Sequence, residues 1–162
     1  MIQIALPSLH VTWLCVTLLS VLYYIYCSEM WNQLDALTGL LNQNSYLNRT
    51  AEMRRSGGVL VVFDVDSFKQ INDRYGHSMG DRAIREIGKI LSASLPEDAV
   101  AIRMAGDEFV ILLSRGNSKM LEDTRAAIED GLRHFNQTTT APFKLSFSLG
   151  LVLSLIHISE PT

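Results

Sequence analysis

The sequence predicts an α+β domain with the split βαβ, ferredoxin-like arrangement, behind an N-terminal transmembrane helix. Two observations support this fold class. After residue 35, apolar patterns follow the order strand, helix, strand, strand, helix, strand, which is the element order of that arrangement. Before it, the first 28 residues contain no Asp, Glu, Lys or Arg. In the predicted topology the sheet is antiparallel, both helices cover one face, and the first strand lies centrally beside a hairpin.

The N-terminal segment, residues 1–28, is expected to be a membrane anchor. Its apolar run from Leu9 to Cys27 is long enough to cross a hydrocarbon core of about 30 Å as a helix. Tyrosines and Trp31 gather at one end, where aromatic rings favour the membrane interface. A secretory signal peptide is disfavoured because no basic segment precedes the run and no small-residue cleavage site follows it. A buried core helix is the other alternative.

Residues 29–34 form a short junction, and three arginines follow within residues 49–55. Because positive charge is typical of the cytoplasmic side, we expect a protein of the inner (cytoplasmic) membrane with its domain in the cytoplasm.

At a formal net charge of −3, the chain gives no electrostatic reason to expect nucleic acid as a partner. Cys15 and Cys27 are too far apart for a CxxC motif, so we expect small buried side chains rather than a disulfide or metal site.

The segment 35–152 is expected to fold as one domain whose elements are each marked by local sequence. Asn42 is placed to cap a helix that runs towards Arg55. The apolar, β-branched run Val59–Val65 is typical of a strand buried on both faces. The remaining elements are a helix, a hairpin, a second amphipathic helix and a half-buried strand, at residues 81–95, 99–104 with 108–114, 121–135 and 143–149.

Acidic residues mark the ends of two of these strands. Asp64 lies near the end of the first strand, and Asp107 and Glu108 follow Gly106 at the predicted hairpin tip. Because the first strand lies beside the hairpin, we expect these carboxylates to converge. Like charges in contact repel, and a divalent cation relieves that repulsion. An all-oxygen set that includes the Val65 carbonyl favours Mg²⁺, with Mn²⁺ as an alternative. Solvated turn acids without any ligand are the competing interpretation.

A second group of polar residues follows the first strand. At the turn into a helix, residues 67–69 offer backbone N–H groups and a lysine ammonium for phosphate oxygens. Asn72 and Asp81 provide an amide and a carboxylate, which together suit the edge of a guanine base. His77 is a further polar candidate on a loop, although a lone histidine is more often a surface residue. Together these residue types indicate a Mg²⁺–GTP site.

Three stretches, DALTGLLNQ (35–43), FDVDSFKQINDRYGHSMGD (63–81) and RMAGDEF (103–109), resemble the three successive signatures of the GGDEF family, the diguanylate cyclases. The resemblance covers about residues 35–152 and implies the palm fold of nucleotidyl cyclases. It also implies a reaction that joins two GTP into cyclic di-GMP with release of pyrophosphate. The implied mechanism uses two metal ions and two facing subunits of a homodimer.

The resemblance further implies roles for individual residues by motif position. Asp64, the Val65 carbonyl and Asp107 would hold Mg²⁺, and Glu108 would lie near the second ion. Asp107 would stand at the proton-acceptor position, and Lys69 would stabilise charge at the transferred phosphoryl group. The positions that would bind the guanine nucleotide are Phe68, Asn72, His77 and Asp81.

The chain departs from the family pattern at several positions. Ala105 replaces the first glycine of the signature, and Gln43 replaces a usual arginine. The family's product-inhibition motif falls on Pro96 and Ala99, so we expect no feedback inhibition through that site. Residues 153–162 (LSLIHISEPT) resemble a translated sequencing adaptor and are excluded from the fold prediction. Relatives continue with another helix and strand, so the GGDEF domain is expected to be partial, which leaves open whether the truncated chain is active.

Three other functions stay open. The first is a catalytically inactive regulatory module that binds GTP or a cyclic dinucleotide, which the intact Asp64, Asp107 and Glu108 disfavour. The second is another nucleotidyl cyclase or polymerase-like palm, which the guanine-reading pair Asn72 and Asp81 disfavours. The third is a membrane-anchored dimerisation module without a ligand, which would leave the carboxylates unexplained.

Overall fold

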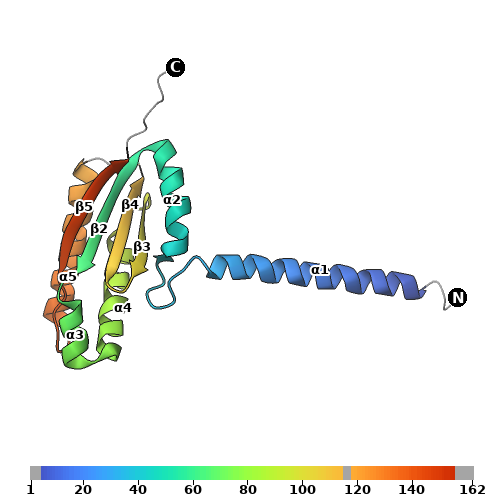
Figure 1. The fold of residues 1–162 in the computed structure, drawn as a ribbon, viewed down its shortest axis with the longest axis horizontal. Helices are drawn as coiled ribbons and strands as arrows, with labels where there is room; N and C mark the ends of the chain where they lie inside the picture. Colours follow the sequence, from blue (N-terminus) through green and yellow to red (C-terminus); the bar gives the residue numbers. More distant parts are fainter. Residues whose placement is uncertain (1–4, 115–117, 156–162) are drawn as a thin grey trace, which may run out of the picture. The chain divides into compact units, whose positions relative to one another are not determined.

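The computed structural model describes residues 5–114 and 118–155 and divides into two compact units, Met1–Gln33 and Leu34–Thr162. The first unit contains α1 (Ala5–Trp31; Figure 1). The apolar residues of this helix are not gathered on one face. Within the described residues, the segment His10–Ser28 of this helix is the one stretch long and apolar enough to cross a membrane, and it has no buried side chain. Cys15 is therefore exposed, contrary to the predicted burial, and neither it nor Cys27 is in a disulfide.

The second unit is built on a five-stranded sheet of order β1-β3-β4-β2-β5 (Figure 1). Strands β2, β3, β4 and β5 reproduce the predicted split βαβ topology, with β2 between β4 and β5. The short β1 was not predicted; it pairs parallel with β3, so the sheet is mixed rather than antiparallel. The strand bounds are Leu41–Asn42 (β1), Gly58–Val65 (β2), Ala99–Ala105 (β3), Glu108–Ser114 (β4) and Phe147–Leu155 (β5).

Helices cover both faces of this sheet. On one face, α4 and α5 bury Ile84, Leu91 and Ile128 against the inward side chains of β2 and β4, as predicted for the two helices. On the other face, α2 buries Met53 against β3 and β4 in a second apolar cluster. Strand β2 is therefore buried on both sides, which explains its nearly uninterrupted apolar sequence. The helix bounds are Gln43–Ser56 (α2), Phe68–Tyr75 (α3), His77–Ser94 (α4) and Ser118–Thr138 (α5).

The start of α2 confirms the predicted cap. Asn42 has an extended backbone, and its side-chain oxygen accepts hydrogen bonds from the amides of Asn44 at 3.0 Å and Ser45 at 3.3 Å. This arrangement satisfies donors that have no partner within the first turn of a helix. At the other end of α2, Gly57 has a φ of 76°, which a residue with a side chain rarely adopts.

Two predicted boundaries are wrong. The helix expected from Asp81 begins at His77. Gly76, with a φ of 84°, interrupts the helical conformation directly before it and separates α4 from α3. His77 is therefore the first residue of a helix and does not lie on a loop. The last strand begins at Phe147 rather than Phe143, because the side chain of Asn136 bonds both the N–H and the carbonyl of Leu145, at 2.8 and 2.7 Å, and so holds that segment beside α5.

The last strand also ends later than expected. Its pairing with β2 continues to a contact between Gly58 and Leu155, so residues 153–155 complete the strand although the sequence assigned them to the tail. The rest of the tail, 156–162, lies outside the described residues. The adaptor-like origin of residues 153–162 stays a prediction.

Candidate functional site

The carboxyl end of β2 and the tip of the β3–β4 hairpin are joined by main-chain contacts. Asp64 faces Glu108 in the antiparallel register, and the amide of Val65 donates to the carbonyl oxygen of Asp107 at 3.3 Å. Directly before this end, the rings of Phe63 and Phe109 stack with centroids 5.3 Å apart. Apolar packing and pairing thus bring the acid-bearing segments side by side, where the topology predicted them.

The acids at this junction influence one another electrostatically. Desolvation of its carboxyl group and then the negative charge of Asp107 raise the pKa of Asp64 above its ordinary value. Glu108 acts in the same direction with a smaller effect, while a hydrogen bond from the Val65 amide opposes it. The protein therefore holds two carboxylates in a position where a positive charge between them would be favourable.

The donor set at this junction fits a hard divalent cation only in part. Among residues 5–114 and 118–155, no group of three His, Cys, Asp or Glu side chains is close enough to hold a metal ion. The predicted convergence therefore amounts to the pair Asp64 and Asp107, with Glu108 exposed across the strand pair. Two carboxylates suit Mg²⁺, because this ion keeps several waters and takes further oxygens from substrate phosphates.

The hairpin tip contains the substituted signature position. Gly106 has a φ of 53°, in the region that glycine adopts without steric cost. Ala105 does not need that freedom, because Ser67 is the one non-glycine residue with a positive φ among those described. The replacement of glycine by alanine at 105 is therefore compatible with the backbone of the turn.

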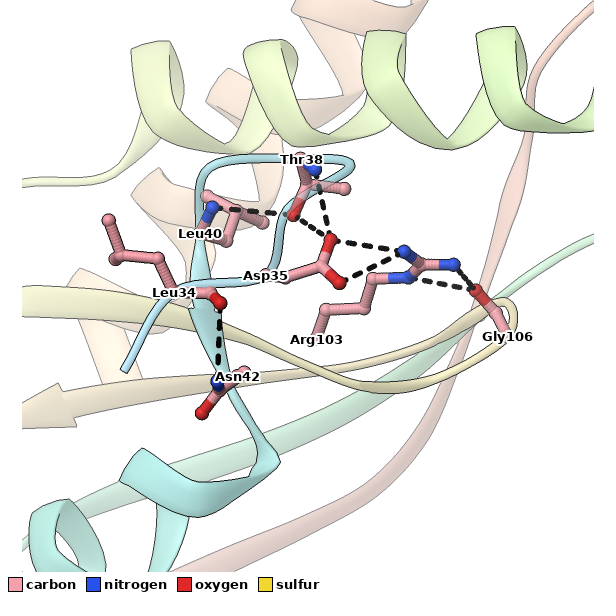
Figure 2. Close-up of polar contacts among 7 residues, drawn as sticks. All are labelled: Leu34, Asp35, Thr38, Leu40, Asn42, Arg103 and Gly106. Atoms are coloured by element: carbon pink, nitrogen blue, oxygen red, sulfur yellow. Dashed lines mark hydrogen bonds and ion pairs between the residues drawn. The ribbon is translucent and has the colours of Figure 1, made fainter. Parts of the chain in front are cut away.

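Arg103 binds the tip of the hairpin through its guanidinium group (Figure 2). Its Nε and Nη2 atoms both donate to the carbonyl oxygen of Gly106, at 3.0 and 2.8 Å. Its Nη1 atom donates to both carboxylate oxygens of Asp35, at 3.0 and 3.2 Å. The guanidinium thus connects the residue directly before Asp107 to the first residue of the DALTGL motif.

The motif loop around Asp35 is itself well bonded (Figure 2). The amide and hydroxyl of Thr38 both donate to Asp35 Oδ1, at 2.9 and 2.7 Å, and the Thr38 hydroxyl accepts from the amide of Leu40. Partial burial acts to raise the pKa of Asp35, but the hydrogen bonds from Thr38 and Arg103 outweigh it and lower that pKa. The sequence prediction gave no role to Asp35 or Arg103, although each is the first residue of a signature stretch, 35–43 and 103–109.

The predicted phosphate-binding turn lies directly after β2. Ser67 adopts a left-handed conformation with φ 57° and ψ 21°, and α3 begins at the next residue, Phe68. Lys69 is exposed in the first turn of this helix. Asp66 instead points to β5, where it accepts a hydrogen bond from the Ser148 hydroxyl. In an extended chain, Asp64 and Asp66 would point to the same face, but the chain leaves the strand conformation after Val65.

All four candidate nucleotide contacts lie on the helical pair α3–α4, and Phe68, the first residue of α3, is partly buried against the core. His77 and Asp81 are exposed in the first two turns of α4, and their spacing of four residues puts them on one face of the helix. Asn72 is half-buried on α3, and its carboxamide packs against Gly80 of α4. The structure therefore places the carboxamide of Asn72 against the residue that precedes Asp81 in the sequence.

A cavity lies elsewhere in the domain. It has a volume of about 550 Å³ and lies between α5 and the start of β5, where it is lined by Arg125, Arg133 and Lys144 among others. None of the residues singled out from the sequence as site candidates lines it. The candidate site is therefore formed by the β2–hairpin junction and the α3–α4 pair.

Comparison with known proteins gives a consistent result. The family described as "Diguanylate cyclase, GGDEF domain" matches residues 32–159. The chain is 41% identical over 95 residues to the diguanylate cyclase DgcS of Shewanella oneidensis, covering 55% of this chain and 32% of the relative. It is 33% identical over 132 residues to the cyclic di-GMP phosphodiesterase PdeR of Escherichia coli, covering 79% of this chain and 20% of the relative.

An uncharacterized membrane protein of Staphylococcus saprophyticus is 33% identical over 134 residues, which cover 76% of this chain and 37% of that protein. Among solved structures, the diguanylate cyclase SiaD of Pseudomonas aeruginosa, in complex with its activator SiaC, superposes with a TM-score of 0.71 at 28% identity. The match covers 90% of this chain and 60% of SiaD. The chain thus spans about a third or less of the length of DgcS and PdeR.

Proposed function

The chain belongs to the GGDEF domain family, and on that premise we propose that it is a diguanylate cyclase that condenses two GTP into cyclic di-GMP and two pyrophosphates. The observation that carries the proposal is the main-chain bond from Val65 to Asp107, which joins the segment ending in Asp64 to the hairpin tip. The raised pKa of Asp64 supports it, because the two acids repel in the absence of a cation.

Divalent ions would be held by the acids of this junction. Asp64, Asp107 and the Val65 carbonyl are the proposed ligands of Mg²⁺ or Mn²⁺, and Glu108 is the proposed neighbour of a second ion. Bound there, the ions would polarise the attacking hydroxyl and neutralise charge on the α-phosphate. The partial donor set leaves coordination positions for water and substrate oxygens, as Mg²⁺ requires.

In the proposed reaction, the 3′-oxygen of one GTP forms a bond to the α-phosphorus of the other, and the bond from that phosphorus to pyrophosphate breaks. Asp107 accepts the proton of the 3′-hydroxyl. Lys69 places its ammonium near the phosphates, and the backbone at Phe68 offers an N–H to their oxygens. Asn72 and Asp81 bind the guanine edge, and His77 contacts the same nucleotide.

A homodimer follows from this stoichiometry. Each domain would hold one GTP, so two domains must face each other across a two-fold axis before either 3′-hydroxyl reaches its target. We propose that the membrane segment assists this pairing. The apolar helix His10–Ser28 and the similarity to a staphylococcal protein named a membrane protein support membrane association. The arginines that follow the helix in the sequence favour a cytoplasmic domain.

The test is turnover by the full chain, purified in detergent, with GTP and Mg²⁺ and with cyclic di-GMP detected by mass spectrometry. We expect product from the wild type, none from Asp107→Ala, and wild-type amounts from Asp73→Ala, since Asp73 is an exposed acid outside the proposed site. Equal product from both variants would contradict the assignment of Asp107.

The alternative is a regulatory module that binds GTP or a cyclic dinucleotide without turnover. It is favoured by the similarity to PdeR, which is named a cyclic di-GMP phosphodiesterase and not a cyclase. The same preparation separates the two functions. A wild type that binds a GTP analogue through Asn72 and Asp81 yet forms no product would support the regulatory module over the cyclase.

A further inference from the structure

Gly80 lies buried in the second turn of α4, where this helix meets α3. A Cβ atom built at this residue would lie 1.9 Å from Oδ1 of Asn72, 2.9 Å from its Cγ and 3.3 Å from its Nδ2. No side-chain atom tolerates the first of these distances. The carboxamide of Asn72 therefore occupies the space that any other residue at position 80 would need.

The surroundings make this contact relevant to the nucleotide site. His77, Gly80 and Asp81 are three and four residues apart, so they share one face of α4. Gly80 is buried and His77 and Asp81 are exposed, so the carboxamide of Asn72 packs on α4 within one turn of both candidate nucleotide contacts. Main-chain bonds close the turn between the helices, from Gly76 to Asn72 at 2.8 Å and from Gly80 to Gly76 at 3.3 Å. These main-chain bonds at the turn do not involve the side chain at position 72.

Glycine at this position is not explained by its backbone. Gly80 is helical, and it is absent from the glycines with positive φ among the described residues. Alanine is favoured over glycine inside a helix, so on local grounds position 80 would be better filled by alanine. The close approach of Asn72 is the feature that requires glycine, a residue without a Cβ atom, at position 80.

We propose that Gly80 is a positioning residue for base recognition. Because it has no side chain, it leaves the space on α4 in which the carboxamide of Asn72 is held beside Asp81. This inference rests on the proposed function, because it deepens the guanine contact assigned to Asn72. A carboxamide reads a base edge through one donor and one acceptor, and both must be oriented before binding. Contact with Gly80 removes alternative rotamers in the free protein, and this preorganisation lowers the entropic cost of binding.

The experiment measures equilibrium binding of non-hydrolysable GTP and ATP analogues to the full chain in detergent with Mg²⁺. The variants are Gly80→Ala, Asn72→Ala and the double variant. We expect Gly80→Ala to weaken binding of the GTP analogue about tenfold, as the loss of one good hydrogen bond would. The added Cβ displaces the carboxamide, so Gly80→Ala and Asn72→Ala should resemble each other in affinity.

The double variant isolates the mechanism. If Gly80 acts through Asn72, then adding Gly80→Ala to Asn72→Ala should not weaken binding further, and the two effects should be strongly non-additive. A purely structural role would weaken binding in both backgrounds. The ratio of GTP-analogue to ATP-analogue affinity provides a second readout, since it does not depend on the folded fraction of a preparation. We expect that ratio to fall in Gly80→Ala towards the value of Asn72→Ala.

Gly131→Ala is the matched control. Gly131 also lies inside a helix, α5, and a Cβ there would approach Cγ2 of Ile90 at 2.8 Å, away from the nucleotide contacts. We expect its affinity to equal that of the wild type. Wild-type affinity of Gly80→Ala, or additive losses in the double variant, would overturn the inference. Absence of binding by the wild type would instead overturn the proposed function.

Discussion

Arg103 and Asp35 are joined by two hydrogen bonds across 68 residues of sequence, at 3.0 and 3.2 Å. Their side chains are 15% and 22% exposed, so the ion pair is largely shielded from water. Because the same guanidinium also binds the carbonyl of Gly106, the tip of the hairpin and the loop that begins the domain are fixed to one group. The position of Asp107 therefore depends on residues far from it in the sequence.

Arg103→Lys should destabilise the domain. A lysine ammonium cannot span Asp35 and Gly106 as a planar guanidinium does, so at least one charged hydrogen bond is lost, worth about 1–3 kcal/mol. Thermal or urea denaturation of the full chain measures the loss. Arg125→Lys is the control, because its pair with Glu129 is 57% and 42% exposed; its change should stay within about 0.5 kcal/mol. Equal effects would contradict the role of Arg103.

Asp35 should make the domain sensitive to acid. Its pKa is lowered below the ordinary 3.8, so the folded state favours the carboxylate more than the unfolded state does. This contribution to stability is present above pH 3.8 and is lost as the pH falls through the lower folded-state pKa. Melting curves recorded above pH 3.8 and below the folded-state pKa should show that the melting temperature falls less on acidification in Asp35→Asn than in the wild type. An unchanged pH profile would argue against this pair as a source of stability.

Asp64 should behave in the opposite sense. Its pKa is raised, so its charged form is disfavoured in the folded state, and its contribution to stability falls as the pH rises through 3.8 and the higher folded-state pKa. At neutral pH in a chelator, Asp64→Asn should therefore melt at a higher temperature than the wild type. Addition of Mg²⁺ should raise the melting temperature of the wild type and not that of Asp64→Asn. Equal stabilisation of both by Mg²⁺ would exclude Asp64 as a ligand.

Substitution by glycine should change the free energy of unfolding in opposite directions at Ser67 and Ala105. Ser67 has a φ of 57°, and relief of this left-handed strain should leave Ser67→Gly up to about 1 kcal/mol more stable. Ala105 has no such strain, so Ala105→Gly should lose about 0.5–1 kcal/mol through the greater freedom of the unfolded chain. Both residues are exposed, which limits packing effects. Chemical denaturation gives the two values directly, and a gain for Ala105→Gly would show strain in the signature turn.

The elements that the sequence predicted well are those with a strong local signal. The run Val59–Val65 is apolar because both faces of the central strand are buried, and Asn42 marks its helix because its side chain replaces missing partners of the first turn. The start of α4 at His77 has no comparable signal, since no side chain caps it. The two residues of β1 are a strand only through pairing with β3, which depends on tertiary structure.

The sequence predicted the acidic residues of the candidate site, but not the side-chain contacts that hold the surrounding segments in place. Asp64 and Asp107 follow from their places at strand ends, and topology then brings those ends together. The links from Arg103 to Asp35 and from Asn72 to Gly80 join segments by side-chain geometry. No periodicity reports such contacts, so they become visible once the helices and the hairpin are placed.

The bond from the Val65 amide to the Asp107 carbonyl has a practical consequence for handling the protein. Because main-chain atoms make this joint, removing both acidic side chains leaves it in place. An Asp64→Asn, Asp107→Asn double variant should keep the shape of the nucleotide-binding surface while losing its chemistry. Immobilised on a resin, such a protein would serve as an affinity reagent that retains guanine nucleotides from cell extracts without consuming them.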